Sequence, residues 1–249
     1  MSSASLIPIK IRSLDPGNLG SADAEFVGTG DDGQDYVIKT IEKTPDVPAA
    51  EWFCHRLADL CGIAVPHYCV LTMPRAAPAF GSRFDGSAVT DYNVKLQIHF
   101  GVLPASLLGE RLSAIHAFDL FVGNNDRHGG NYLFVRGMKS YSVQAFDFSR
   151  AWTQTGWPIP DLPLDTACNT MDWFNQLLPH HLFSHAAAQE VLRRIRAVSK
   201  SDVKAIYDKM PLKWCAKEKR KAIVEWWSTK AKLDRLAQVE LELKNGRYK

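Results

Sequence analysis

The sequence predicts an α+β fold with a small β-rich N-terminal lobe, at about residues 1–85, and a mainly helical C-terminal lobe, at about 86–249. Segments rich in β-favouring residues are concentrated before about Met73. After that point, apolar residues at helical intervals dominate, and one predicted hairpin interrupts them. A length of 249 residues with 46% hydrophobic content suits a single domain, 1–249, with a substantial core.

Three strands are expected first, at Ile7 to Leu14, Ala24 to Val27 and Asp35 to Thr40. We expect Gly28, Gly30 and Gly33 to form the turn between the second and third strands.

A glycine-containing loop, residues 16–23, lies between the first two strands. Gly20 would let the backbone approach phosphate groups closely, and Ser21 could donate a hydrogen bond to them. The signal is weak because the loop lacks the G-x-G-x-x-G spacing. The chain also has no Walker A sequence, which argues against a P-loop nucleotide hydrolase.

A lysine at the end of the third strand precedes a predicted helix. Glu51 lies near the start of that helix, which ends at Gly62. Lys39 could hold nucleotide phosphates while Glu51 positions the lysine. The alternative is that Lys39 lies on an ordinary surface strand and that Glu51 is a helix-start acid favoured by the helix dipole.

The segment Asn-Asp-Arg-His-Gly-Gly-Asn, at 125–131, is the most informative part of the chain. The apolar run from Leu112 to Phe121 predicts a helix that stops at Gly123-Asn124, so Asp126 is expected on the loop that follows.

Two strands, Tyr132 to Val135 and Tyr141 to Phe146, are expected to form a hairpin that returns Asp147 beside Asn131. Phosphoryl transfer needs one carboxylate to orient a hydroxyl, together with metal-bound oxygen ligands to neutralise the triphosphate. Asp126 suits the first role, and Asn131 with Asp147 suits the second, because Mg²⁺ prefers oxygen ligands.

In this order, the residues resemble the HipA-like serine/threonine kinases, the toxin kinases of bacterial toxin–antitoxin modules. The resemblance spans about residues 5–240. Its elements are Lys39, Glu51, Gly-Ile-Ala-Val-Pro at 62–66, Ser-Arg-Phe-Asp at 82–85, the loop at 125–131 and Asp147. Asp-Arg-His-x-x-Asn is also shared with the more distant phosphatidylinositol 3- and 4-kinases, whereas the Gly-Ile-x-Val-Pro and Arg-Phe-Asp elements favour HipA.

The resemblance implies a bilobed protein-kinase-like fold that uses ATP and Mg²⁺. It implies that Asp126 is the catalytic base and that His128 supports the catalytic loop or the phosphates. Asn131 and Asp147 would bind magnesium. The ATP-binding residues would be Lys39 with Glu51, Gly20 and Ser21 in the phosphate loop, and Ser82, Arg83 and Phe84 at the hinge. Ser21 is also the candidate for autophosphorylation.

Larger HipA proteins carry an N-terminal subdomain before the kinase core, whereas here the first core strand begins almost at Met1. The resemblance is therefore to a short form, such as the HipT kinases of three-component modules, in which a small antitoxin or N-subdomain-like partner supplies the missing part. A small-molecule or lipid kinase on the same fold remains an alternative, as does a non-catalytic nucleotide-binding interaction protein.

The five cysteines include no C-x-x-C pair, which argues against a disulfide framework and a zinc site. With no signal-peptide pattern and no long apolar span, we expect a cytoplasmic protein without membrane association.

Positive charge is concentrated from residue 193 onward, where 17 Lys or Arg face 7 Asp or Glu. We expect a helix to start at Ser201-Asp202 and one long helix to run from Lys217 to Lys244. The basic surface is either a solvated helix face or an attraction for an acidic partner, such as an RNA-associated protein substrate. Direct nucleic-acid binding is left open, since no DNA-binding motif is present.

Overall fold

The computed structural model describes residues 7–15, 26–74, 76–84, 96–98, 100, 105–136, 141–151, 168–178 and 183–245. Gly20 and Ser21 lie outside these described residues.

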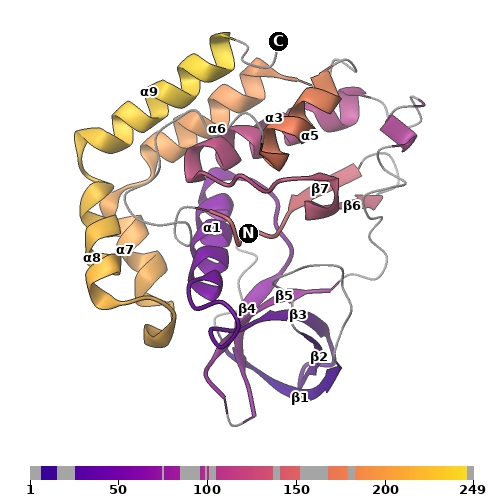
Figure 1. Ribbon diagram of the computed structural model, residues 1–249, viewed down its shortest axis with the longest axis vertical. Helices are drawn as coiled ribbons and strands as arrows, with labels where there is room; N and C mark the ends of the chain where they lie inside the picture. Colours follow the sequence, from indigo (N-terminus) through magenta and orange to yellow (C-terminus); the bar gives the residue numbers. More distant parts are fainter. Residues whose placement is uncertain are drawn as a thin grey trace.

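Five strands close into a barrel at one end of the molecule (Figure 1). They are β1 (Ile9–Asp15), β2 (Phe26–Gly30), β3 (Asp35–Lys39), β4 (Tyr68–Thr72) and β5 (Ala79–Arg83). The strand order is β1-β2-β3-β5-β4, and the barrel closes through the parallel pairing of β1 with β4. Closure leaves few unpaired strand edges, and a small apolar cluster that includes Ile11, Tyr36 and Leu71 fills the interior.

The prediction for the three glycines after Phe26 was wrong for two of them. Gly28 and Gly30 lie in β2, and Gly33 alone is in the turn, with φ of 76°. A β-carbon on Gly28 would lie 2.8 Å from the Cδ1 atom of Ile38 and 2.9 Å from the carbonyl oxygen of Ser13. Gly28 is therefore needed for close packing inside the barrel rather than for chain reversal.

Helices form most of the rest of the described fold. They are α1 (Val47–Cys61), α3 (Ala105–Val122), α5 (Asn169–Leu177), α6 (His185–Ala197), α7 (Lys200–Asp208), α8 (Lys217–Trp226) and α9 (Lys230–Asn245), with short 3₁₀ turns η1 (Gly129–Asn131) and η3 (Leu212–Trp214). The glycines predicted to end α1 and α3 do so: Gly62 and Gly123 have φ of 73° and 67°.

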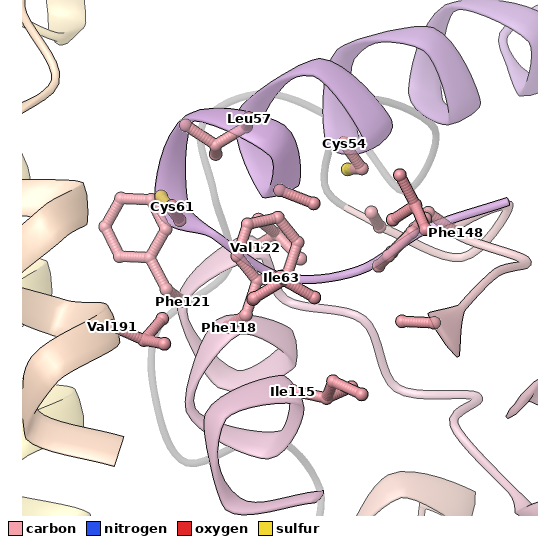
Figure 2. Close-up of a cluster of buried hydrophobic side chains, with 14 of the residues drawn as sticks. Cys54, Leu57, Cys61, Ile63, Ile115, Phe118, Phe121, Val122, Phe148 and Val191 are labelled. Carbon is pink, nitrogen blue, oxygen red and sulfur yellow. The ribbon is translucent and has the colours of Figure 1, made fainter. Parts of the chain in front are cut away.

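Helix α1 lies between the barrel and the other helices (Figure 1). It is buried on almost every side, and its Trp52 donates a hydrogen bond of 3.1 Å from Nε1 to the carbonyl of Ile206 in α7. Figure 2 shows side chains of α1, α3 and α6 in one apolar cluster with Phe148, which follows the last strand; those labelled are Cys54, Leu57, Cys61, Ile63, Ile115, Phe118, Phe121, Val122, Phe148 and Val191. This packing fixes α1 relative to the loops at the ends of α3 and of the hairpin.

The expected hairpin is confirmed. Its strands are β6 (Tyr132–Arg136) and β7 (Tyr141–Ala145), and Tyr132 pairs with Ala145. The amide of Phe146 donates to the carbonyl of Asn131 over 3.3 Å. The two chain segments that flank the hairpin are therefore neighbours.

The C-terminal region was predicted less well. Helix α7 starts at Lys200, where Ser199 and Asp202 form a capping box, so its start is one residue earlier than expected. The prediction of a single long helix from Lys217 was wrong, because the helix ends at Trp226 and a second helix starts at Lys230. There, Thr229 donates through Oγ1 to the Trp226 carbonyl over 2.7 Å, and Trp227 donates through Nε1 to the Val198 carbonyl over 2.8 Å.

No helix in the described part of the chain combines the length and the apolar character needed to cross a bilayer. All five cysteines are free thiols, and four of them are buried.

Two buried histidines should make the fold sensitive to acid. Burial lowers the pKa of His55 and of His116, in each case to about 3, against about 6.5 in an unfolded chain. The unfolded state therefore binds protons first as the pH falls below 6.5, and each histidine should cost about 2 kcal/mol of stability at pH 5.

Replacing His116 by Phe keeps an aromatic ring against Phe174, whose centroid lies 3.8 Å away. Between pH 7.5 and pH 5, the variant should lose about 2 kcal/mol less unfolding free energy than the wild type in urea titrations. An equal loss in both proteins would contradict the prediction.

Candidate active site

Lys39 connects three parts of the fold. Its Nζ atom lies 2.7 Å from Oε1 of Glu51, on α1, and 2.8 Å from Oδ1 of Asp147, after β7. Lys39 and Glu51 are 5% and 1% exposed, so the alternative of a surface strand lysine and a helix-start acid is wrong. Glu51 lies in the second turn of α1, which starts at Val47. A buried lysine between two acids is the arrangement predicted for a phosphate-binding lysine and its partner.

The charges in this cluster depend on one another. Burial opposes the charge on Lys39, but Asp147 and Glu51 outweigh it and raise the lysine pKa. Burial likewise opposes ionisation of Asp147, yet Lys39 holds the pKa of that carboxyl well below its usual range. For Glu51 burial prevails and raises its pKa to about 7. Asp147 is thus the more firmly ionised of the two acids.

Asp147 has a left-handed backbone conformation, with φ of 59°, the one positive value among the described non-glycine residues. This conformation turns the chain sharply after the hairpin. The next amide, that of Phe148, then donates to Oε1 of Glu51 over 2.9 Å. Such strain in a non-glycine residue is characteristic of functional positions.

The loop that carries Asp126 is held from inside by Arg127. This buried guanidinium donates from Nε to Oδ2 of Asp119 over 2.8 Å and from Nη2 to Oδ1 over 2.9 Å. Asn124 also donates to Asp119, over 2.9 Å. This bidentate ion pair fixes the loop to α3, because separating the two groups would leave an unpaired charge in the core at a high cost in free energy.

Arg127 also joins the two ends of the hairpin. Its Nη1 atom donates to the carbonyls of Asn131, over 2.9 Å, and of Phe146. The Nδ2 atom of Asn131 donates to the backbone carbonyl of Asp126 over 2.8 Å. The structure therefore brings Asp126, Asn131 and the residue before Asp147 into one bonded network.

His128 is exposed and caps the short turn η1. Its Nδ1 atom accepts a hydrogen bond of 3.1 Å from the amide of Gly130. This contact fits the loop-supporting role that the sequence offered as one of two alternatives for His128.

Ser82, Arg83 and Phe84 lie at the end of β5, on the strand next to β3. Ser82 pairs with Val37, in the middle of β3, and Arg83 pairs with Tyr36, whereas the partner of Lys39 is Phe80. Ser82 is half-buried, whereas Arg83 and Phe84 are exposed. In the part of the chain that the structure describes, none of these three residues forms a hydrogen bond or an ion pair with Glu51, Asp126 or Asp147.

Several residues of the site were missed by sequence reasoning. Asn169 and Thr170, at the start of α5, contact the loop at 125–131 from more than forty positions away. The sequence held one signal of such contacts, which is Asp119. It is an acid within the apolar run of α3, and a buried acid indicates that a positively charged partner lies nearby in the fold.

The two residues that flank the hairpin, Asn131 and Asp147, carry oxygen atoms of the kind that magnesium binds. No group of three or more His, Cys, Asp or Glu gathers as metal ligands in the described ranges. The oxygen ligands here would be the carboxylate of Asp147 and the amide oxygen of Asn131, whose nitrogen is already bonded to Asp126. Mg²⁺ suits such a site, because it takes few protein oxygens and keeps several waters.

The sequence model of one protein family, described as HipA-like kinase, matches residues 18–242. A search of curated protein sequences finds no significant match.

The chain is similar to a number of solved structures. The proinflammatory kinase CtkA of Helicobacter pylori has a TM-score of 0.62 at 15% identity, over 94% of this chain and 96% of CtkA. HipA of the Shewanella oneidensis MR-1 toxin–antitoxin system, in a complex with HipB and operator DNA, has a TM-score of 0.50 at 16% identity. That match covers 89% of this chain and 62% of HipA. At these identities the likeness shows the fold, and the predicted α+β kinase-like fold class is confirmed.

Proposed function

Because the chain belongs to the HipA-like kinase family, we propose that it is an ATP- and Mg²⁺-dependent serine/threonine protein kinase. One observation carries the proposal. Lys39 bonds Asp147 on one side of the site, and Arg127 joins the Asp126 loop to the backbone beside Asp147 on the other. These are the groups that phosphoryl transfer uses to hold a triphosphate and to orient a hydroxyl.

In the proposed reaction, Asp126 accepts the proton of the acceptor hydroxyl as its oxygen attacks the γ-phosphorus of ATP. The bond between the γ-phosphorus and the bridging oxygen breaks, and ADP leaves. The ammonium group of Lys39 stabilises charge on the phosphates while Glu51 and Asp147 hold it in place. Magnesium, held by Asn131 and Asp147, would neutralise the triphosphate. His128 supports the loop through its bond to Gly130.

We also propose that the kinase has two lobes, at about 1–85 and 86–249, with adenine bound at Ser82, Arg83 and Phe84. Support comes from the barrel strands, which all lie between Ile9 and Arg83, at the end of the molecule opposite α9 (Figure 1). Gly20 and Ser21 are proposed for the phosphate loop on sequence grounds. We propose that the reaction takes place in the cytoplasm, where ATP is available.

The family and the similar HipA structure support a further proposal, that this kinase is the toxin of a bacterial toxin–antitoxin system. Its partners would then be a protein substrate with a Ser or Thr acceptor and a small antitoxin or N-subdomain-like protein.

Intact-mass measurement after incubation with ATP and Mg²⁺ tests the kinase proposal. We expect the protein, or an added mixture of Ser/Thr peptides, to gain the mass of one or more phosphoryl groups, and EDTA to prevent the gain. Phosphoinositide and aminoglycoside acceptors should be incubated in parallel. Transfer to one of these acceptors but to no polypeptide would reject the protein-kinase proposal in favour of a lipid or small-molecule kinase. No transfer at all would reject phosphotransfer.

A further inference from the structure

Asn169 holds the side chain of the candidate base. Its Nδ2 atom donates a hydrogen bond of 2.6 Å to Oδ1 of Asp126. Asn169 is the first residue of α5, and it follows Asp126 by 43 positions. A short bond from an amide to a carboxylate is among the stronger neutral-donor contacts, because the acceptor is charged.

Within the described part of the chain, the bond from Asn169 is the one hydrogen bond that the Asp126 carboxylate accepts. Among the described residues, no ion pair involves Asp126, and the neighbouring Arg127 turns inward to Asp119. The terminal torsion of an aspartate is broad, so a half-buried carboxylate without a partner samples many orientations. A base must present one oxygen within hydrogen-bond distance of the hydroxyl it deprotonates.

We propose that Asn169 is a positioning residue for phosphoryl transfer, and the proposal rests on the kinase function above. By engaging Oδ1, the amide leaves Oδ2 of Asp126 as the oxygen that receives the proton of the acceptor hydroxyl. The donor is uncharged, so it orients the carboxylate without introducing a cation that would compete with Lys39 for the phosphates.

Thr170 stabilises this contact, because it attaches the start of α5 to the same loop. Its buried Oγ1 atom accepts from the amide of Arg127 over 2.8 Å and donates to the carbonyl of Asn124 over 2.7 Å. The amide of Thr170 in turn donates to the Asn125 carbonyl over 3.4 Å. Asn169 is therefore the chain neighbour of a residue that is bonded to the loop carrying Asp126.

If Asn169 had a purely structural role, it would stabilise the start of α5. The structural role and the positioning role predict different results for the substitution Asn169→Asp. Asp is nearly the same shape as Asn, and an acid in the first turn of a helix is favourable. It has no amide donor, however, and would place a second carboxylate against Asp126. Asn169→Asp should therefore leave α5 at least as stable while it displaces the Asp126 side chain.

The experiment compares the wild type with Asn169→Asp, Asn169→Ala and Asn175→Asp. The last is a matched control, the same change at an exposed position of the same helix. Initial rates of transfer to a Ser/Thr peptide mixture give kcat and the KM for ATP, and thermal unfolding gives stability. We expect kcat to fall about 10- to 100-fold in both Asn169 variants, with little change in the KM for ATP, while Asn175→Asp behaves as wild type.

Wild-type kcat in Asn169→Asp would overturn the proposal and leave the kinase function intact. A kcat loss in Asn169→Asp accompanied by an equal loss in Asn175→Asp would also overturn it, because the effect would then lie in the helix. If the wild type itself transfers no phosphate, the proposed function fails and the role of Asn169 fails with it.

Discussion

Replacing Asp126 by Asn should lower the rate of phosphoryl transfer by about 10²- to 10⁴-fold, the contribution typical of a general base. The side chain keeps its shape, and its amide oxygen can still accept the bond from Asn169. The substituted group cannot take up a proton, so the loss is chemical rather than structural. Asp126 takes part in no ion pair among the described residues, and stability should change by less than about 0.5 kcal/mol.

The measurement is transfer of labelled phosphate from ATP, together with ATP affinity and thermal unfolding of the same protein. Asp208→Asn is the control, because Asp208 is an exposed acid whose one ion pair among the described residues is with Lys204, at 2.6 Å. We expect wild-type transfer by the control and unchanged ATP affinity in Asp126→Asn. Undiminished phosphorylation by Asp126→Asn would remove its assigned role as base.

Replacing Asp147 by Asn should lower transfer at least as strongly, by about 10³-fold or more, because it weakens two electrostatic elements together. The variant loses the proposed anionic ligand of magnesium and one of the two carboxylates that hold Lys39. Asn adopts the left-handed conformation of this position readily, so the backbone should stay as it is. Lys39 keeps its bond of 2.7 Å to Glu51.

Two comparisons test this second prediction. Raising the Mg²⁺ concentration should partly restore transfer in Asp147→Asn if the lost ligand is responsible, and it should not restore Asp126→Asn. Asp147→Ala should be less stable than Asp147→Asn by about 1 kcal/mol, because alanine is strained at positive φ. Equal Mg²⁺ dependence in the wild type and Asp147→Asn would contradict the metal role.

The residues that carry the proposed chemistry were predictable because their signals are local. The acid, the amide five positions later and the acid after the hairpin occupy one short stretch, and turn and strand preferences within it decide how it folds. Lys39 and Glu51 were predicted from the strand and helix that hold them. Gly62 and Gly123 were predicted as helix ends for the same reason, since a left-handed residue is a property of the local backbone.

Predictions failed where the deciding contact is remote in sequence. The helix from Lys217 stops after Trp226, where Trp227 is buried and bonds Val198, 29 positions away. The local bond from Thr229 to the Trp226 carbonyl accompanies this break. Gly28 was misassigned because its need for space arises from Ser13 and Ile38 on the neighbouring strands.

The sequence by itself determined which groups are available for the proposed phosphoryl transfer: an ammonium group, three acids and an amide, on elements of predictable type and order. Only the tertiary structure decided how they are held. It turned Arg127 inward to Asp119, placed Asn169 on Asp126 and left Lys39 between Glu51 and Asp147. The physical reason is that short-range preferences select helix, strand and turn, whereas the partner of a buried charge depends on which distant segments the core packs together.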